Sequence, residues 1–200
     1  AEVALKYSEG MREDDQKAML AMLSAAQQMK GLTEDLLILA RTDRVSPMLL
    51  SAVNLSKLLN KLMKLYEPQT VEKGIELTAD IAPALLLRGD PADLTRAFTN
   101  LLQNSIRYTT SGGTVKLEAV QKDHQLQVTI RDTGVGIAKE NLERIFERFW
   151  RADRTRRFDD GGAGLGLSIT QAVVQRHGGK VAVTSTVGSG SCFFVTLPMA

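Results

Sequence analysis

The sequence predicts a two-layer α/β sandwich with a mixed sheet, preceded by the remnant of a helical hairpin. Helical spacing without strands fills the first 43 residues, whereas helical and strand-like segments alternate after residue 50. Most strand-like segments come in pairs joined by short turns, so they form hairpins and leave the helices to cover one face. A break at Ser46-Pro47 separates a partial helical hairpin at residues 1–45 from a second domain at 46–200.

The N-terminal part is expected to be a long amphipathic helix from about residue 12 to 43. Its apolar residues Met22, Met29 and Leu36 recur every seven positions, which is the spacing of a seam between packed helices. Residues 1–7 also favour a helix and residues 8–10 a turn, so we expect the chain to begin partway along an earlier helix. The seam predicts partner helices.

The second domain shows alternating signals for helices and strands. Helices are expected at 54–73, 91–108 and 165–176, and strands at 75–81, 85–88, 115–121, 125–131, 180–186 and 191–197. Asp90 stands at the N-cap of the second of these helices. Turns at 122–124 and 188–190 join the last four strands into two hairpins.

Composition excludes several classes of protein. Lys and Arg number 25 against 23 Asp and Glu, a net charge of +2 that gives no strong field, so no nucleic-acid partner is expected. Cys192 is the only cysteine, so neither an intramolecular disulfide nor a cysteine metal cluster can form, and a cytoplasmic location is expected. No apolar run approaches the roughly 18 to 20 residues that span a bilayer, although a part of an inner-membrane sensor would look the same.

An acidic residue followed by two glycines stands where the predicted strand at 125–131 ends. The segment is Asp132-Thr133-Gly134-Val135-Gly136-Ile137. A carboxylate there can accept a hydrogen bond from an exocyclic amine, and glycines let the backbone approach a planar ring, which together suit adenine. Taken alone, the motif is also typical of an ordinary glycine turn with a capping aspartate.

A glycine-rich run, Gly161-Gly162-Ala163-Gly164-Leu165-Gly166, leads directly into the predicted helix at 165–176. Backbone N–H groups there, together with the helix N-terminus, can bind an anion such as phosphate. A flexible linker is the alternative, although linkers rarely lead into so apolar a helix. No lysine follows the glycines, so the run is not a Walker A loop.

Two asparagines, Asn100 and Asn104, are four residues apart and therefore share one face of the predicted helix at 91–108. An amide oxygen in a pocket can complete the octahedral shell of Mg²⁺, which bridges phosphates. A solvent-facing side of the helix is the alternative. Guanidinium groups suited to phosphate stand at Arg107, Arg148, Arg151, Arg154, Arg156 and Arg157.

In chain order, these motifs resemble the N, G1, F and G2 boxes of the sensor histidine kinases. They are Asn100-x-x-x-Asn104, Asp132-x-Gly-x-Gly, Phe146-Glu147-Arg148-Phe149 and Gly162-x-Gly-x-Gly. The resemblance covers nearly everything from about residue 50 onward, and implies a Bergerat-type fold that binds ATP or ADP with Mg²⁺. It also implies a homodimer through the hairpin to which residues 1–43 belong, and a response regulator receiver domain as partner of the full-length parent.

The resemblance further implies roles for individual residues. Asn104 would bind Mg²⁺, Asp132 would bind the adenine amine, and a mobile lid from Arg148 to Ala163 would cover ATP. The implied catalytic residues are Asn104, Arg107 and Arg151, the last reaching the γ-phosphate. The implied nucleotide contacts are Asn100, Asn104, Arg107, Tyr108, Asp132, Gly134, Gly136, Ile137, Gly162, Gly164, Leu165 and Gly166.

The residue at position 100 distinguishes relatives that hydrolyse ATP from relatives that transfer its phosphoryl group, although both share this nucleotide-binding site. ATP-hydrolysing relatives carry a glutamate there to activate water, and an amide is a poor general base, so transfer to an imidazole is favoured over hydrolysis. No His-Glu acceptor motif is present, because His124 falls in a predicted turn and His177 at a helix end, where a structural cap with a cationic ring is expected.

We therefore expect a protein-histidine kinase domain that does not phosphorylate itself and whose acceptor lies upstream of Ala1. A nucleotide-gated, non-enzymatic interaction module is the alternative, and a hydrolytic ATPase is a third possibility.

Overall fold

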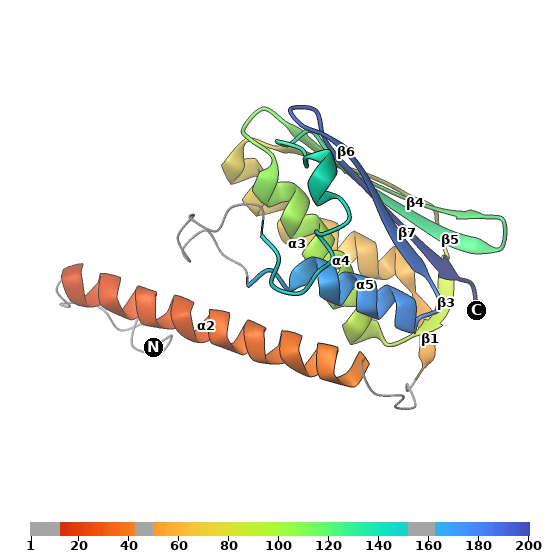
Figure 1. Ribbon diagram of the computed structural model, residues 1–200, viewed down its shortest axis with the longest axis horizontal. Helices are drawn as coiled ribbons and strands as arrows, with labels where there is room; N and C mark the ends of the chain where they lie inside the picture. The colour runs from red at the N-terminus through yellow and green to blue at the C-terminus, as the bar shows by residue number, and fades with distance from the viewer. Residues whose placement is uncertain (1–12, 43–49, 152–162) are drawn as a thin grey trace.

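The computed structural model describes residues 13–42, 50–151 and 163–200 of the 200-residue chain (Figure 1). Its elements are α2 (Glu13–Thr42), β1 (Ser51–Asn54), α3 (Leu55–Lys73), β2 (Glu76–Ile81), β3 (Leu86–Gly89), α4 (Pro91–Tyr108), β4 (Thr114–Lys122), β5 (Gln125–Asp132), η1 (Lys139–Asn141), α5 (Gly166–Arg176), β6 (Lys180–Thr186) and β7 (Gly190–Pro198). Every predicted helix and strand within these ranges is present, with its ends within one residue of prediction.

The architecture is the predicted two-layer α/β sandwich with a mixed sheet. The five strands lie in the order β2-β4-β5-β7-β6, in which β2 is parallel to β4 and the other neighbours are antiparallel. α3, α4 and α5 cover one face of this sheet (Figure 1). Strands bury alternate residues toward the helices, such as Val115, Leu117 and Ala119 of β4, because successive side chains point to opposite faces.

A separate two-stranded sheet pairs β1 with β3, antiparallel, and was not predicted as such. β1 has four residues, of which only Val53 is a buried apolar residue, so no alternating pattern could reveal it. It is a strand because its backbone pairs with that of β3, with Ser51 opposite Gly89.

The caps of the helices agree with the sequence. The Asp90 carboxylate accepts hydrogen bonds from Ala92 N and Asp93 N at the start of α4. α3 ends at Gly74, whose φ of 68° is the left-handed conformation that glycine adopts without strain. Asp90 thereby sets the start of the helix that bears Asn104.

α4 and α5 run antiparallel and are joined near both ends of α5. At its C-terminal end, Arg176 pairs with Asp93 of α4, with 3.6 Å between Nη1 and Oδ2. At its N-terminal end, Nδ2 of Asn100 donates to the carbonyl oxygen of Gly166 at 3.0 Å. The start of α5 is therefore held against the middle of α4.

His177 ends α5 as a structural residue, but its ring is neutral. The side chain is buried, Nδ1 lies 2.8 Å from the carbonyl oxygen of Val173, and Nε2 accepts a hydrogen bond from Asp90 N at 3.0 Å. A ring nitrogen that accepts a hydrogen bond has no proton, so the proton is on Nδ1. The predicted cationic ring was wrong, because tertiary packing places a backbone donor at Nε2.

α2 lies across the second domain, beside α5 (Figure 1). Its Leu39 is buried in a small apolar cluster with Ala97 of α4, with Ile169 and Val173 of α5, and with Leu165. This cluster places α2 directly against the residue that precedes α5.

The predicted seam of α2 faces away from this contact. Met22, Met29 and Leu36 are 67%, 64% and 51% exposed, so none of the described residues covers them. The expected helix at 1–7 and the break at Ser46-Pro47 lie outside the described residues. Within residues 13–42, 50–151 and 163–200, no helix combines the length and the hydropathy needed to cross a membrane.

Candidate functional site

A cavity of about 1040 Å³ lies where α4, the end of β5 and the start of α5 meet. Segments far apart in the sequence come together here, as predicted. The predicted site residues on its wall are Asn100, Asn104, Arg107, Tyr108, Asp132, Gly136, Ile137, Arg151, Gly164, Leu165 and Gly166. Gly134 is not on the wall, and Gly162, Arg154, Arg156, Arg157 and most of the predicted lid lie outside the described residues.

Asp132 ends β5 and is 5% exposed. Its Oδ1 accepts hydrogen bonds from Gly134 N at 2.9 Å and Ser191 N at 3.1 Å, and its Oδ2 accepts one from Ser105 Oγ at 3.3 Å. Burial raises the pKa of the Asp132 carboxyl, and these hydrogen bonds oppose the rise. Each carboxylate oxygen has two lone pairs, so Oδ2 can accept a further donor, such as an exocyclic amine.

The structure shows a second reason why glycine is required at positions 134 and 136, in addition to the predicted approach of a planar ring. A Cβ on Gly134 would lie 2.5 Å from the carbonyl oxygen of Tyr108, and a Cβ on Gly136 would lie 2.1 Å from that of Thr186. Gly136 also has a φ of 72°. The glycines were assigned to the approach of a planar ring. In the structure they let the loop after Asp132 pack between the end of α4 and the end of β6.

The described ends of the predicted lid are held together beside the cavity. Phe149 N donates to the carbonyl oxygen of Gly164 at 3.0 Å, and a Cβ on Gly164 would lie 2.8 Å from the carbonyl oxygen of Trp150. Gly164 has a φ of 73°, which favours glycine. Arg151 and Ala163, which flank residues 152–162, both line the cavity. The lid segment therefore leaves and rejoins the described structure at the cavity.

The start of α5 is suited to an anion. α5 has no side-chain cap hydrogen bond within the described structure and no acidic residue in its first turn. The first N–H groups of a helix lack intrahelical acceptors, and the helix dipole makes this end positive. Because Gly164, Leu165 and Gly166 line the cavity, these groups adjoin it, which is the arrangement that phosphate binding uses.

The sequence analysis missed Lys73, which holds the end of α4. Its Nζ donates to the carbonyl oxygens of Ile106 at 2.6 Å and Arg107 at 2.7 Å. Desolvation, together with the nearby charge of Arg107, lowers the pKa of Lys73. Val135 N also donates to the carbonyl oxygen of Tyr108 at 3.1 Å. A lysine in the last turn of α3 signals only a cap for its own helix, so the sequence could not reveal this contact.

The turn between β6 and β7 was predicted, but its place in the cavity wall was missed. Val187 lines the cavity, and the next residue, Gly188, donates its N–H to the carbonyl oxygen of Val135 at 2.9 Å. Ile137 N donates to Ser185 Oγ, 48 residues along the chain, at 2.8 Å. From sequence, this Gly- and Ser-rich turn indicates a hairpin and no more.

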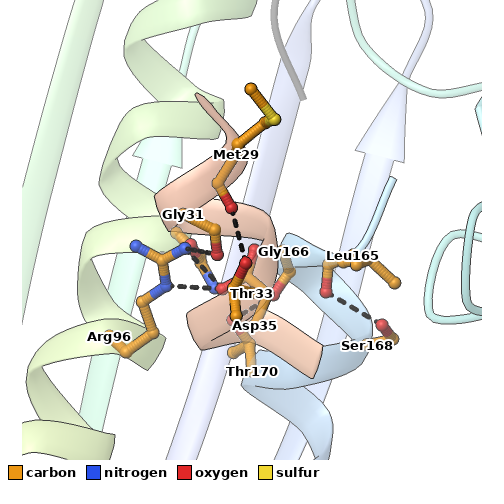
Figure 2. A network of polar contacts seen from close by, with 10 residues as sticks. Met29, Gly31, Thr33, Asp35, Arg96, Leu165, Gly166, Ser168 and Thr170 are labelled. Atoms are coloured by element: carbon orange, nitrogen blue, oxygen red, sulfur yellow. Dashed lines mark hydrogen bonds and ion pairs between the residues drawn. The ribbon is translucent and has the colours of Figure 1, made fainter. Parts of the chain in front are cut away.

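α2 contributes to the wall as well. Figure 2 shows Arg96 of α4 reaching Asp35 and the carbonyl oxygen of Gly31 on α2. Arg96 Nε lies 2.8 Å from Asp35 Oδ1, and Nη2 forms an ion pair with the same oxygen. Both Gly31 and Asp35 line the cavity. Arg96, Asn100 and Asn104 are spaced by four and therefore share one face of α4. One end of this face contacts α2, and the other end bears the residue predicted to bind Mg²⁺.

The donor set is compatible with Mg²⁺ bound mainly through its substrate. Among the described residues, no group of three or more His, Cys, Asp or Glu side chains could hold a metal ion. Mg²⁺ typically takes one or two protein oxygens and completes its shell with phosphates and waters. The partly buried Asn104, on the cavity wall, would provide one such oxygen.

A family of known proteins matches the part of the chain that forms this site. Residues 89–200 match the family described as histidine kinase-, DNA gyrase B- and HSP90-like ATPases. The match includes α4, the loop after Asp132 and the glycine run before α5. The chain belongs to this family, and its relatives identify it as an ATP-binding catalytic domain of the sensor histidine kinase type.

Two curated relatives illustrate the likeness. The chain is 35% identical to the sensor histidine kinase CusS of Escherichia coli K12 over 199 residues, which are 98% of this chain and 41% of CusS. It is 32% identical to the phosphate regulon sensor protein PhoR of Pseudomonas aeruginosa over 178 residues, 88% of this chain and 40% of PhoR. The chain thus spans about two fifths of these relatives.

Solved structures share the fold. Full-length ShkA in complex with AMPPNP is 28% identical with a TM-score of 0.81, over 98% of this chain and 41% of ShkA. The catalytic domain of the histidine kinase ThkA, in a nucleotide-free form, is 25% identical with a TM-score of 0.66, over 76% of this chain and 96% of that domain. The two-layer fold is therefore that of histidine kinase catalytic domains.

Proposed function

We propose that this chain binds Mg-ATP and donates the γ-phosphoryl group to a histidine on a helical hairpin of a two-component signalling protein. One observation is central: a single cavity is lined by the buried Asp132 carboxylate and by the start of α5, which has no side-chain cap among the described residues. The carboxylate suits the amine of adenine, and the helix start suits phosphate. ATP presents both groups in one molecule.

In this proposal most nucleotide contacts lie on the cavity wall; Gly134 does not line it, and Gly162 is outside the described residues. Asp132 accepts from the adenine amine, Arg107 and Tyr108 lie near the phosphates, and Arg151 reaches the γ-phosphate. Asn104 would hold Mg²⁺, which when bound would supply positive charge at the phosphate oxygens. The remaining contacts are Gly134, Gly136, Ile137, Gly162, Gly164, Leu165 and Gly166.

Asn100 is proposed to shape the site and to disfavour hydrolysis. Its Nδ2 already donates to Gly166 O at 3.0 Å, which positions the start of α5. An amide does not accept a proton near neutral pH, so water in the cavity has no general base at this position. Transfer to an imidazole needs less assistance, because phosphoryl transfer depends chiefly on positioning and charge stabilisation. A bond forms between the imidazole nitrogen and the γ-phosphorus. At the same time the bond between the γ-phosphorus and the β,γ-bridging oxygen breaks, and ADP leaves.

The acceptor is proposed to lie on a segment other than those described. His177 is buried with both ring nitrogens engaged in hydrogen bonds. His124 is in the turn before β5, whereas Asp132 ends that strand. The eight residues of β5 separate the two by about 25 Å, at about 3.3 Å per residue. Neither histidine lines the cavity, so neither is placed to receive the phosphoryl group.

The proposed partners are a second copy of the chain and a response regulator receiver domain. The exposed Met22, Met29 and Leu36 on α2 support a homodimer through the helical hairpin. The receiver domain would take the phosphoryl group from the acceptor histidine onto an aspartate, as expected for relatives named sensor histidine kinases.

A nucleotide-gated interaction module is the second candidate. It is favoured by the contact between Leu165, next to the glycine run, and Leu39 of α2. Binding of ATP at the glycine run could alter this contact and change what α2 binds, without any transfer of phosphate.

The decisive experiment mixes this chain with a separate hairpin and γ-labelled Mg-ATP. The second helix of the hairpin has the sequence of residues 13–42, and its first helix bears a histidine. We expect acid-labile, base-stable label on that histidine, no label on this chain, and slow phosphate release. Asn104→Ala is expected to abolish transfer, and Asn60→Ala, a change of the same kind on α3, to preserve it.

Binding of ATP without labelling of the hairpin would support the interaction module instead. Steady release of phosphate by the chain alone, at a rate exceeding transfer, would support a hydrolytic ATPase.

A further inference from the structure

Three exposed apolar or aromatic side chains gather on the wall of the cavity. Val187 is 65% exposed, Val135 54% and Tyr108 50%, and all three line the cavity. Single exposed apolar residues are common on protein surfaces. Three that converge on a cavity beside a buried carboxylate instead provide apolar surface that a planar ring would cover.

The turn that bears Val187 is fixed to the loop after Asp132. Gly188 N donates to the carbonyl oxygen of Val135 at 2.9 Å, and Ser185 Oγ accepts from Ile137 N at 2.8 Å while donating to Gly190 O at 2.7 Å. These hydrogen bonds hold the turn on both sides of Val187. Its position relative to the loop is therefore set by the backbone and not by the valine side chain.

The far end of the same turn touches Asp132 itself. Ser191 N donates to Asp132 Oδ1 at 3.1 Å, and a Cβ on Gly190 would lie 2.0 Å from the Asp132 carbonyl oxygen. The group that would bind the amine of a base and the turn that bears Val187 thus form one unit. A base held at Asp132 has to lie within reach of this turn.

We propose that Val187 is a base-contacting residue that covers apolar surface of the adenine ring. The inference deepens the proposed function and rests on it, because the contact exists only if the amine of adenine is bound at Asp132. The carboxylate recognises one polar edge of the base, and Val187 excludes water from carbon atoms of the ring. Nothing in the turn's sequence signals this role.

The test compares Val187→Ser with Val71→Ser. Val71, on α3, is 72% exposed and does not line the cavity, so it receives the same chemical change at a similar exposure. Calorimetric titration with ATP and with ADP is expected to show an affinity about 3- to 10-fold weaker for Val187→Ser, and unchanged for Val71→Ser. The loss should be equal for ATP and ADP, because the base is common to both. Val187→Ile is expected to retain wild-type affinity.

Three outcomes would overturn the inference: equal affinities of Val187→Ser and Val71→Ser, a loss confined to ATP, or a matching loss in Val187→Ile. Thermal unfolding of each variant shows whether the fold is retained, and a melting temperature lowered only in Val187→Ser would give the valine a structural role. Failure of the proposed function can be told apart from failure of the inference about Val187. If the proposed function is wrong, Asp132→Asn leaves the affinity for ATP unchanged. If Asp132→Asn weakens binding and Val187→Ser does not, only the role of Val187 is refuted.

Discussion

Asp132, the residue proposed to bind the adenine amine, lowers the stability of the fold. Its carboxylate is buried, and three hydrogen bonds from Gly134, Ser191 and Ser105 compensate only partly for the water it loses. Because its pKa is raised in the folded state, the ionised group lowers the free energy of unfolding. This effect is present above the raised pKa and disappears as the pH falls below the ordinary value of 3.8.

Asp132→Asn is expected to weaken ATP binding and to leave the fold intact. The side-chain oxygen of asparagine can still accept from Gly134 N and Ser191 N, but its NH₂ group would face the amine of adenine. We expect a loss of about 1 to 3 kcal/mol, or about 5- to 150-fold in affinity by calorimetry. The melting temperature at neutral pH should be unchanged or higher, since a buried charge has been removed.

Asp123→Asn provides the matched control for that change. Asp123 is exposed in the turn before β5, at the opposite end of the strand from Asp132. Asp123→Asn should change neither the affinity for ATP nor the free energy of unfolding. An Asp132→Asn protein that binds ATP as tightly as this control would refute the adenine assignment.

At the scale of elements, α4 connects α2 to the nucleotide cavity. Arg96 pairs with Asp35 on α2, and one turn further along Asn100 holds Gly166 at the start of α5. The side chains of Arg96 and Asp35 are 28% and 13% exposed, so the pair is largely shielded from water. Replacing either member removes this ion pair, and replacing both removes the same ion pair only once.

Asp35→Asn and Arg96→Gln are therefore expected to be non-additive. Each single change should loosen α2, seen as faster hydrogen exchange at residues 31–39, with the sheet unaffected. The double variant should be less perturbed than the sum of the singles, by a coupling of about 1 to 2 kcal/mol. The pair formed by Lys116 and Glu118 is 48% and 41% exposed. Neutralising both of its members in the same way should give almost no coupling free energy. Strict additivity at Asp35 and Arg96 would show that their pairing does not hold α2.

At the scale of the whole molecule, α2 has two faces with different roles. One face, with Leu39 and Asp35, packs on the second domain. The other exposes Met22, Met29 and Leu36. An apolar row that the described chain leaves uncovered is expected to be covered in an assembly.

Replacing Met22, Met29 and Leu36 together with Gln is expected to shift the chain from dimer to monomer. Glutamine retains helix propensity, so the helix itself should persist. Light scattering over a range of concentrations would measure the shift, with Leu65→Gln, at an α3 residue 64% exposed, as the control. A wild-type chain that is monomeric at every concentration would refute the dimer formed by this segment.

Elements with local signals were predictable. Asp90 marks the start of α4 and Gly74 the end of α3, because caps depend on residues adjacent in sequence. β1 was not predictable, because it is a strand only by pairing with β3. The roles of Asp132 and Asn104 stay predictions, drawn from their chemical types and from the resemblance to sensor histidine kinases; the structure places both on the cavity wall.

Contacts between distant segments explain what could not be predicted. Lys73 caps another helix, Ser185 binds the loop before Ile137, and the neutral ring of His177 depends on the backbone of Asp90. The approach of a planar ring to Gly134 and Gly136 stays a prediction, whereas the close contacts that the structure shows at both are to protein backbone.

By itself the sequence determined the order and ends of most helices and strands, the chemical groups available to a nucleotide, and the family to which they belong. The tertiary structure alone decided that these groups share a cavity with the β6–β7 turn and with α2. The physical reason is that caps and periodicity act between near neighbours along the chain. Hydrogen bonds, ion pairs and burial act between atoms that become neighbours only when the chain folds.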